Sequence, residues 1–510
     1  MTQNERPAPA APLYNRAAGA LLLALLALRL VTAARFGLAW DEAYYWQWSR
    51  HVALCYYDAG PGIALCIRAG TIPFGDTPFG VRFVPIVLSV AANTLLFATA
   101  RRWFDARVAW WTLVLAAASP LLAIGSVLAT YDLPQVFFWA AGLYCVTRAV
   151  QKNTPAWWYA TGLCVGLGTL TKPTMIFFAP GALLLLALVP AYRKHLQSPH
   201  PYLAFALALV CLAPMFVWNA QHGNLNWIHT LNRGNRDTGA APGRWLGDFW
   251  GGQLLVTGPF VLLAELAALW AAARRWQEPR NAFVLAFAAP LLLVCTVLSV
   301  RSKVEINWPV AAHLSALVGV GAQFAAQTAS RATRTFRAVA VTTSALVTYV
   351  LFLPNVLLLR PFGPFRSNGT WEKVNELYGW QTIAAAIARE RAALAAADPK
   401  TPIFYAGTGY RVCSVMAFYL PGQPRVEKLQ IPGTRRDQYE LWTNEVALAG
   451  QNAVVAIDQE RPEEAAYLRT RFVKMSAPTL VHVTRRGFLG DVKTWYVYRC
   501  RGFVPLVPPR

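Results

Sequence analysis

The stretch AAGALLLALLALRLVTAARFGLAWDEAYYWQWSRH, residues 17–51, decides the fold of this 510-residue chain. Its first half, Ala17–Ala34, is apolar over a length that lets a helix cross a bilayer. That half is longer than the apolar core of a cleaved signal peptide, so we expect a retained first helix. The second half sets two adjacent carboxylates, Asp41 and Glu42, among aromatic residues that favour a membrane interface.

The composition places the whole chain among polytopic membrane proteins. Hydrophobic residues make up 56% of it and charged residues 14%, against about a quarter charged in an ordinary globular chain. About eleven apolar stretches are long enough for membrane-spanning helices, the two starting at Leu133 and Ala156 being short. The predicted spans are Ala17–Ala34, Phe83–Ala100, Val108–Ala129, Leu133–Thr147, Ala156–Leu170, Thr174–Val189, Tyr202–Trp218, Leu254–Ala273, Ala282–Val300, Trp308–Ala326 and Ala338–Leu359.

The net charge of +22 follows the predicted topology. Basic residues gather in alternate short loops, as cytoplasmic connections require, so the charge does not call for a nucleic-acid partner. Arg6 and Arg16 then place the N-terminus in the cytoplasm, and an odd number of spans exports everything after Leu359. The basic loops contain Arg101, Arg102 and Arg107; Arg148 and Lys152; Arg193 and Lys194; Arg274, Arg275 and Arg280; and Arg331, Arg334 and Arg337.

A second domain follows the spans. From about Thr370 the apolar runs shorten to strand length and alternate with helical patterns, which is typical of a small α/β domain. We therefore predict a transmembrane domain over 1–369, with an interfacial first exported loop over 35–80, and an exported α/β domain over 370–510. Cys413 and Cys500 are the only cysteines for which a disulfide is considered. Strands are expected at 401–407, 453–458, 480–484 and 495–500, and helices at 380–397 and 463–472.

Charged side chains recur where predicted spans meet the exported face. Such residues are more often functional than decorative. A carboxylate base together with cations or a metal is the mixture that a reaction needs when it removes a hydroxyl proton and expels a phosphate. The residues are Asp41, Glu42, Asp132, Lys172, His222, Arg301, Lys303 and Glu305.

Simpler interpretations remain open for each of them. The acids of residues 41 and 42 can face water from an interfacial helix, Lys172 can extend to lipid headgroups, and a lone loop histidine such as His222 is usually solvated. A polytopic flippase or transporter would also carry buried charges, although the sequence has no repeated half. A structural subunit would leave the clustered charges unexplained.

Seven motifs in order resemble the GT-C superfamily of polyprenyl-phosphate-sugar-dependent glycosyltransferases. The similarity is to the bacterial branch related to lipid A aminoarabinose transferase and to protein O-mannosyltransferases, and it covers nearly the whole chain. The motifs are WDEAYYWQWSRH with YYD, FGDTPFGVRFVP, TYDLPQVFFWAAGLY, GLGTLTKPTMIFFAPG, PMFVWNAQHG, NWPVAAH and AFYLPGQPRV.

The resemblance implies a GT-C fold and a set of site roles. Asp41 would be the general base that deprotonates the acceptor hydroxyl, Glu42 its neighbour, and transfer would proceed with inversion. Asp132 would position the acceptor or a metal, and Lys172 would face the lipid phosphate. The partners would be a polyprenyl-phosphate sugar and an envelope glycolipid or protein, at the periplasmic face of a bacterial inner membrane, with no nucleic acid.

One departure from the family affects the phosphate contact. Relatives carry a basic residue before a Pro-Pro pair, whereas this chain reads DAGPG, with Ala59 and Gly60 in place of the basic residue and the first proline. Arg68 or Arg82 could compensate, as could Lys172. Cofactors stay open, with a divalent metal as one possibility and Glu42 and His222 as its candidate ligands. The sugar and the acceptor also stay open.

The topology can be tested with reporter fusions. A reporter after Arg360 should be active on the exported side, and one near Arg275 on the cytoplasmic side, because the basic loops alternate. A cytoplasmic signal from the fusion after Arg360 would mean that one of the short spans, Leu133–Thr147 or Ala156–Leu170, is wrong.

Overall fold

The computed structural model describes residues 11–233, 243–326, 330–352, 376–459, 462–484 and 491–506. The chain divides into two compact units. The helical unit comprises Met1–Ala34, Val52–Gly75 and Phe79–Leu353, and the α/β unit comprises Arg35–His51, Asp76–Pro78 and Pro354–Arg510. The predicted domain boundary at 369/370 lies outside the described residues.

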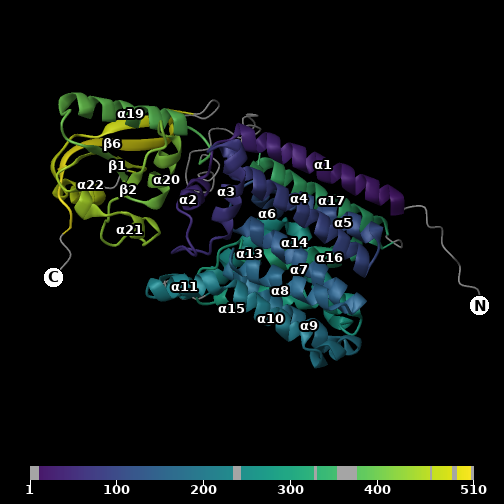
Figure 1. The fold of residues 1–510 in the computed structure, drawn as a ribbon. Helices are drawn as coiled ribbons and strands as arrows, with labels where there is room; N and C mark the ends of the chain where they lie inside the picture. Colours follow the sequence, from purple (N-terminus) through teal and green to yellow (C-terminus); the bar gives the residue numbers. More distant parts are fainter. Residues whose placement is uncertain are drawn as a thin grey trace, which may run out of the picture. The chain divides into compact units, whose positions relative to one another are not determined.

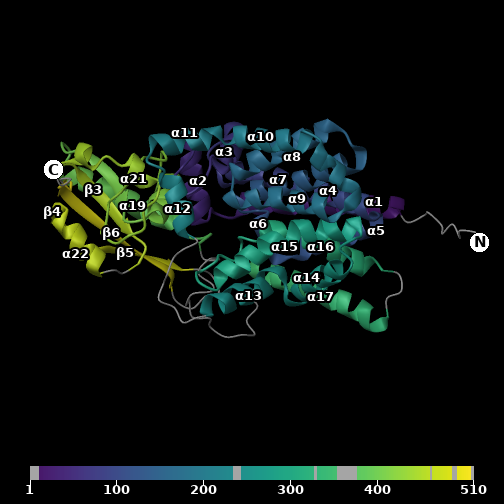
Figure 2. The same cartoon turned by 90° about the horizontal axis from the view of Figure 1, so that it is seen from below.

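The helical unit is a bundle, drawn in purple to green in Figure 1 and Figure 2. Each predicted apolar stretch lies mainly on helix as far as it is described, although residues 126–129 of Val108–Ala129 follow the end of α6. The helices are α1 (Ala11–Arg35), α3 (Gly62–Phe74), α4 (Pro78–Trp103), α5 (Ala106–Ala118), α6 (Pro120–Gly125), α7 (Asp132–Lys152), α8 (Pro155–Thr169), η1 (Pro173–Phe177), α9 (Phe178–Leu188), η2 (Pro190–Gln197), α10 (His200–Cys211), α11 (Ala213–Gln221), α12 (Leu225–Arg233), α13 (Arg244–Thr257), α14 (Pro259–Arg274), α15 (Pro279–Ser299), α16 (Val310–Ala325) and α17 (Arg331–Phe352).

Several predicted spans are broken helices. Proline follows the break before α6 and before α14, where its missing N–H costs no intrahelical hydrogen bond. The axis bends by 106° between α13 and α14. Among the described residues, four helices are long and apolar enough to span a membrane, or up to six if each bent pair is one span. The structure thus supports a helical membrane unit and leaves the count of eleven as a prediction.

Aromatic packing holds the centre of the bundle together. Trp139 of α7 meets Phe178 of α9 edge to face at 5.1 Å between ring centroids, and Phe178 meets Phe287 of α15 at 4.7 Å. Such pairs add to the area that the rings bury. Trp139 Nε1 also donates to Ser315 Oγ of α16 at 3.3 Å, so α7 is fixed to two neighbouring helices.

The α/β unit contains a six-stranded sheet in the order β2-β1-β3-β6-β4, with β5 also paired to β6. β1 is parallel to β2 and β3, while β6 runs antiparallel to β3, β4 and β5. Helix α19 packs on β3, β5 and β6, and Figure 1 shows it alongside β6. The elements are α2 (Trp40–Arg50), α19 (Trp380–Ala397), β1 (Ile403–Gly407), α20 (Tyr410–Tyr419), β2 (Val426–Lys428), α21 (Tyr439–Trp442), η4 (Glu445–Leu448), β3 (Asn452–Ile457), α22 (Pro462–Thr470), β4 (Phe472–Met475), β5 (Thr479–Thr484) and β6 (Asp491–Phe503).

Most of this unit follows the sequence pattern. The four predicted strands correspond to β1, β3, β5 and β6, and the two predicted helices to α19 and α22. Helix α20 and the short strands β2 and β4 were not predicted. A disulfide between Cys413 and Cys500 is absent, since both are free, buried thiols.

Helix α2 belongs to the segment 35–80, whose position at the membrane interface stays a prediction. Its aromatic side chains are buried and pack within the α/β unit. Tyr44 stacks on Tyr439 at 6.0 Å and lies 4.6 Å from Tyr410, and Trp46 meets Phe418 at 4.8 Å. Aromatic residues suit a protein interior as well as a membrane interface, and these side chains contribute to the interior of the α/β unit.

The sharp bend between α13 and α14 depends on Gly258. Its φ of +91° is one that side chains rarely adopt, and a Cβ there would collide with Ser344. Gly258→Ala should therefore destabilise the protein by about 1–3 kcal/mol, measured as thermal unfolding of the purified protein in detergent. Gly247→Ala is the control, because nothing lies within 4 Å of its added Cβ. Equal unfolding temperatures for the two variants would contradict the constraint.

Candidate active site

An ion pair between Lys172 and Asp132 forms the centre of the candidate site. Asp132 is the first residue of α7, and Lys172 lies in the turn between α8 and η1. Lys172 Nζ donates to Asp132 Oδ1. The Lys172 side chain is 5% exposed and that of Asp132 15%. The structure thus brings together two residues that the sequence assigned to separate roles.

Asn307 completes a three-residue cluster. Its side-chain amide donates to Asp132 Oδ2 at 2.9 Å, and its backbone carbonyl accepts from Lys172 Nζ at 3.3 Å. Both carboxylate oxygens of Asp132 are therefore hydrogen-bonded, and two of the three ammonium donors of Lys172 are occupied. Asn307 lies three residues before α16, so the cluster joins α7, the Lys172 turn and the start of α16.

The Lys172 turn is itself held by α7. Gln135, one turn along α7 from Asp132, donates from Nε2 to Thr174 Oγ1 at 2.7 Å. The Tyr131 ring lies 5.6 Å from Lys172 Nζ, within the range of a cation–π contact. These contacts fix the lysine by backbone and side chain together.

The DAGPG segment packs directly against the residues before Lys172. The Gly62 N–H donates to the Leu170 carbonyl at 3.3 Å. A Cβ on Gly60 would overlap the same carbonyl, and one on Gly62 would overlap Thr171. The departure from the family motif is therefore a close backbone approach, for which glycine is suited.

Helix α12 supports the same segment. Asn226 Nδ2 donates to the carbonyls of Tyr56 and Tyr57, at 2.9 and 3.2 Å. His229 Nε2 lies 3.7 Å from Asp58 Oδ1, and its ring lies 4.7 Å from that of Tyr57. Asp58 and His229 are both buried, so a carboxylate and an imidazole face each other on this segment.

A buried polar chain lies behind Asn307. Gln253 Nε2 donates to the carbonyl of Ile306, the residue before Asn307, at 3.0 Å. His313 Nε2 and Gln253 Oε1 are 2.9 Å apart, and His313 Nδ1 and Glu265 Oε2 are 2.7 Å apart. All three side chains of this chain are 2% exposed or less. Buried polar groups of this kind are costly unless paired, and here they tie α13, α14 and α16 to the Asn307 turn.

Asp41 belongs to the α/β unit, in the first turn of α2. It is exposed, and its Oδ1 accepts from the Tyr410 hydroxyl at 3.2 Å. The same hydroxyl accepts from Arg411 Nε at 3.3 Å. Burial, and then the nearby charge of Asp41, raise the pKa of Tyr410. The phenol therefore stays protonated and able to donate to the carboxylate.

Glu42 has a structural task. It is 0% exposed, and its Oε2 accepts from the backbone N–H of Ala39 at 2.9 Å, which caps the start of α2. The neighbouring Asp41 accepts from the Tyr410 hydroxyl instead. The two adjacent acids thus divide into a buried cap and an exposed carboxylate.

The other predicted residues take separate positions. Arg68 of α3 is exposed. Arg82 of α4 is buried, and its guanidinium donates to the Ala33 carbonyl at 3.5 Å. His222 stacks on Trp218 at 4.1 Å, and its Nδ1 lies 2.9 Å from the Trp218 carbonyl.

The metal candidates Glu42 and His222 lie in different units. In the part of the chain that the structure describes, no group of three or more His, Cys, Asp or Glu side chains could hold a metal ion. A metal role for these two residues stays a prediction.

Comparison with known proteins identifies sequences and folds similar to this chain. Residues 58–218 match the family described as dolichyl-phosphate-mannose-protein mannosyltransferase. The lipid A galacturonosyltransferase RgtD of Rhizobium johnstonii is 31% identical over 280 residues, or 54% of this chain and 59% of the relative. The match therefore spans less than two thirds of the relative's length. The resemblance to the GT-C glycosyltransferases is confirmed.

Two solved structures of ArnT from Cupriavidus metallidurans share the fold of this chain. The apo structure matches with a TM-score of 0.61 and 16% identity, over 96% of this chain and 98% of ArnT. The structure bound to undecaprenyl phosphate matches with a TM-score of 0.60 and 16% identity, over 94% and 97%. At this identity the similarity concerns the fold alone.

Sequence reasoning missed several residues of the candidate site. Asn307 and His313 lie within the quoted motif NWPVAAH, but neither was singled out. Glu265, inside an apolar helix, was the signal that could have been used, because a carboxylate within a span needs a partner. Tyr410 and Arg411 follow the strand predicted at 401–407, and neither was singled out.

The Lys172–Asp132 pair can be tested by a double-mutant cycle. Lys172→Met or Asp132→Asn alone should cost about 3–5 kcal/mol, because each leaves its partner buried without compensation. The double variant should be more stable than the sum of the two losses. The matched control is the exposed pair Lys303–Glu305, 3.4 Å apart, where removal should cost at most about 1 kcal/mol. Additive losses at 132 and 172, measured by thermal unfolding, would show that the two residues are not coupled.

Proposed function

We propose that this chain is an integral membrane glycosyltransferase that moves a sugar from a polyprenyl-phosphate carrier to an envelope glycolipid at the periplasmic face of a bacterial inner membrane. The observation that carries the proposal is the Asp132–Lys172–Asn307 cluster beside the DAGPG segment, in which Lys172 is buried and Asp132 and Asn307 are partly buried. A buried cation with one donor left is suited to a phosphate oxygen.

The comparisons support the substrate class. RgtD is described as a lipid A galacturonosyltransferase, and one ArnT structure contains undecaprenyl phosphate. We infer a lipid-phosphate sugar donor and a lipid A-like acceptor for this chain, with a protein as the other acceptor class. A polytopic flippase or transporter is the alternative, and it predicts no transferred sugar.

In the proposed mechanism Asp41 is the general base. Its carboxylate takes the proton of the acceptor hydroxyl, whose oxygen then attacks the anomeric carbon and inverts it. The bond from that carbon to the phosphate oxygen breaks, and its electron pair leaves with the phosphate. The Tyr410 hydroxyl, held by Arg411, orients the carboxylate so that its second oxygen is available for the proton.

Lys172 serves the leaving group. Negative charge develops on the phosphate as the glycosidic bond breaks, and a fixed ammonium stabilises it most at that point. Asp132 and Asn307 hold the ammonium in place. Arg68 and Arg82 remain proposed donor-phosphate residues.

Mass spectrometry of envelope glycolipids tests this function. A strain lacking the chain should lose a hexose-, pentose- or uronic acid-sized mass from a glycolipid, and purified protein with the polyprenyl-phosphate sugar should restore it. An unchanged glycolipid profile, together with no transfer by the purified protein, would favour the transporter.

Asp41→Asn should lower the turnover rate by roughly 10²- to 10⁴-fold, because the amide cannot accept the proton. Glu42→Gln is the matched control: a glutamine oxygen can still cap α2, so turnover should change by only a few fold. Both rates are measured after the expression level and the unfolding temperature have been verified. An Asp41→Asn enzyme with near wild-type turnover would assign proton transfer to another residue, Asp132 first.

A further inference from the structure

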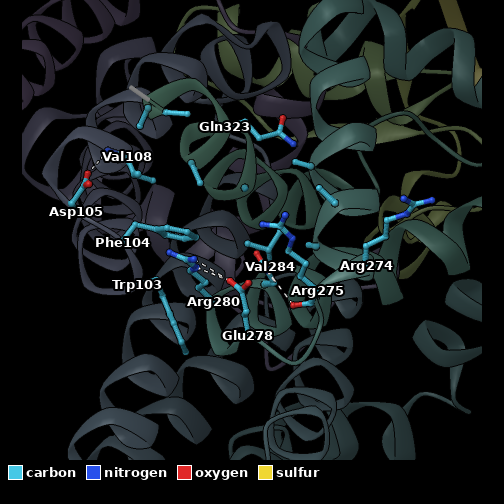
Figure 3. Close-up of a pocket in the computed structure, with 18 of the residues that line it drawn as sticks. Trp103, Phe104, Asp105, Val108, Arg274, Arg275, Glu278, Arg280, Val284 and Gln323 are labelled. Carbon is cyan, nitrogen blue, oxygen red and sulfur yellow. Dashed lines mark hydrogen bonds and ion pairs between the residues drawn. The ribbon is translucent and has the colours of Figure 1, made fainter. Parts of the chain in front are cut away.

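A cavity lies in the helical unit, at the end of the bundle away from Lys172. It has a volume of about 920 Å³ and is lined by residues of α14, α15 and α16 and of the turn before α5 (Figure 3). Asn307 precedes the start of α16, whereas Gly319 and Gln323, near the end of α16, line the cavity. A helix of 16 residues is about 24 Å long, so the two sites are separate.

The charge that lines this cavity is positive. Among the residues that the structure describes, its arginines are Arg107, Arg274, Arg275 and Arg280, and its carboxylates are Asp105 and Glu278. Both carboxylates are engaged. Asp105 accepts the backbone N–H groups of Arg107 and Val108 as the cap of α5, and Glu278 pairs with Arg280 at 3.0 Å.

Two guanidinium groups are left for a ligand. Across the ranges that the structure describes, the side chains of Arg107 and Arg275 make no ion pair or hydrogen bond. In Figure 3 the Arg275 and Arg280 side chains lie together near the centre of the view, while Arg274 lies apart. Arg274 stacks on Trp270 at 3.9 Å.

The floor of the cavity is apolar. Val108, Ala268, Ala272, Val284 and Gly319 supply it. A small inorganic anion would use the arginines and leave this surface uncovered. A ligand with a phosphate attached to a hydrocarbon chain would use both.

We propose that this cavity binds an anionic phospholipid, with its phosphate between Arg107 and Arg275 and the start of an acyl chain on the apolar floor. Topology alone accounts for arginines in these loops. It does not require them to line one cavity with an apolar floor. Basic pockets between membrane helices on the cytoplasmic side are suited to phospholipid headgroups, and this end of the bundle is the predicted cytoplasmic one.

The test uses the full chain in nanodiscs of phosphatidylcholine with 20% phosphatidylglycerol, and native mass spectrometry counts the lipids retained. The wild type should retain phosphatidylglycerol at least fivefold over its share of the bilayer. Arg107→Gln with Arg275→Gln should abolish this preference. Arg331→Gln with Arg334→Gln is the control, because these arginines are exposed on the same predicted face and do not line the cavity.

A filling variant separates a lipid from a free phosphate. Ala322→Phe keeps every arginine and fills part of the cavity, so it should lose the retained lipid. The site would be assigned to a free anion by two results together. Millimolar inorganic phosphate would remove the lipid preference of the wild type, and the same phosphate would still bind the Ala322→Phe variant. Equal lipid retention by the wild type and the Arg107/Arg275 variant would overturn the proposal. Ala322→Phe then serves as the second folded variant if the arginine pair fails to express.

Discussion

The buried ion pair between Lys172 and Asp132 sets the constraint on which the helical unit depends. A charge inside a helical bundle is tolerated only when its partner is held in place. Three segments distant in sequence supply the parts: the start of α7, the turn after α8, and the residue three positions before α16. Any packing of the bundle that separates these segments leaves an ammonium or a carboxylate without compensation, so the pair selects one arrangement of the helices around it.

The surrounding contacts follow from that requirement. Glycines at positions 60 and 62 let the first loop approach the Leu170–Thr171 backbone, where any side chain would push the Lys172 turn away. A series of hydrogen bonds runs from Glu265 through His313 and Gln253 to the Ile306 carbonyl. It fixes the turn that presents Asn307. Four hydrogen bonds therefore connect Glu265 to Asp132, the last of them from Asn307 to the Asp132 carboxylate, so a substitution of Glu265 would disturb the site.

The sequence predicted the parts of this structure that depend on local pattern. The length of the apolar stretches predicted the helices of the helical unit. Short apolar runs that alternate with helical patterns predicted β1, β3, β5 and β6. The charges at 132 and 172 stood out because charged side chains beside apolar helices at the predicted exported face are more often functional than decorative. Asn307 did not, since a neutral amide in a loop has no distinctive pattern. The pairing of His313 with Glu265, 48 positions apart, needs the fold. The aromatic residues of α2 suited an interface and an interior equally, and only tertiary contacts decide between them.

The donor count at Lys172 limits what the cluster can do alone. An ammonium has three N–H groups, and Asp132 and the Asn307 carbonyl take two of them. One remains for a lipid phosphate, and the Asp132 carboxylate beside it repels the same phosphate. In the proposed function Lys172 can then favour the charge that develops late in the reaction without binding the donor tightly. Affinity for the lipid-phosphate donor in the ground state must then come from further hydrogen-bond donors, the role proposed for Arg68 and Arg82. The adjacent Asp132 carboxylate favours release of the phosphate once the sugar has been transferred.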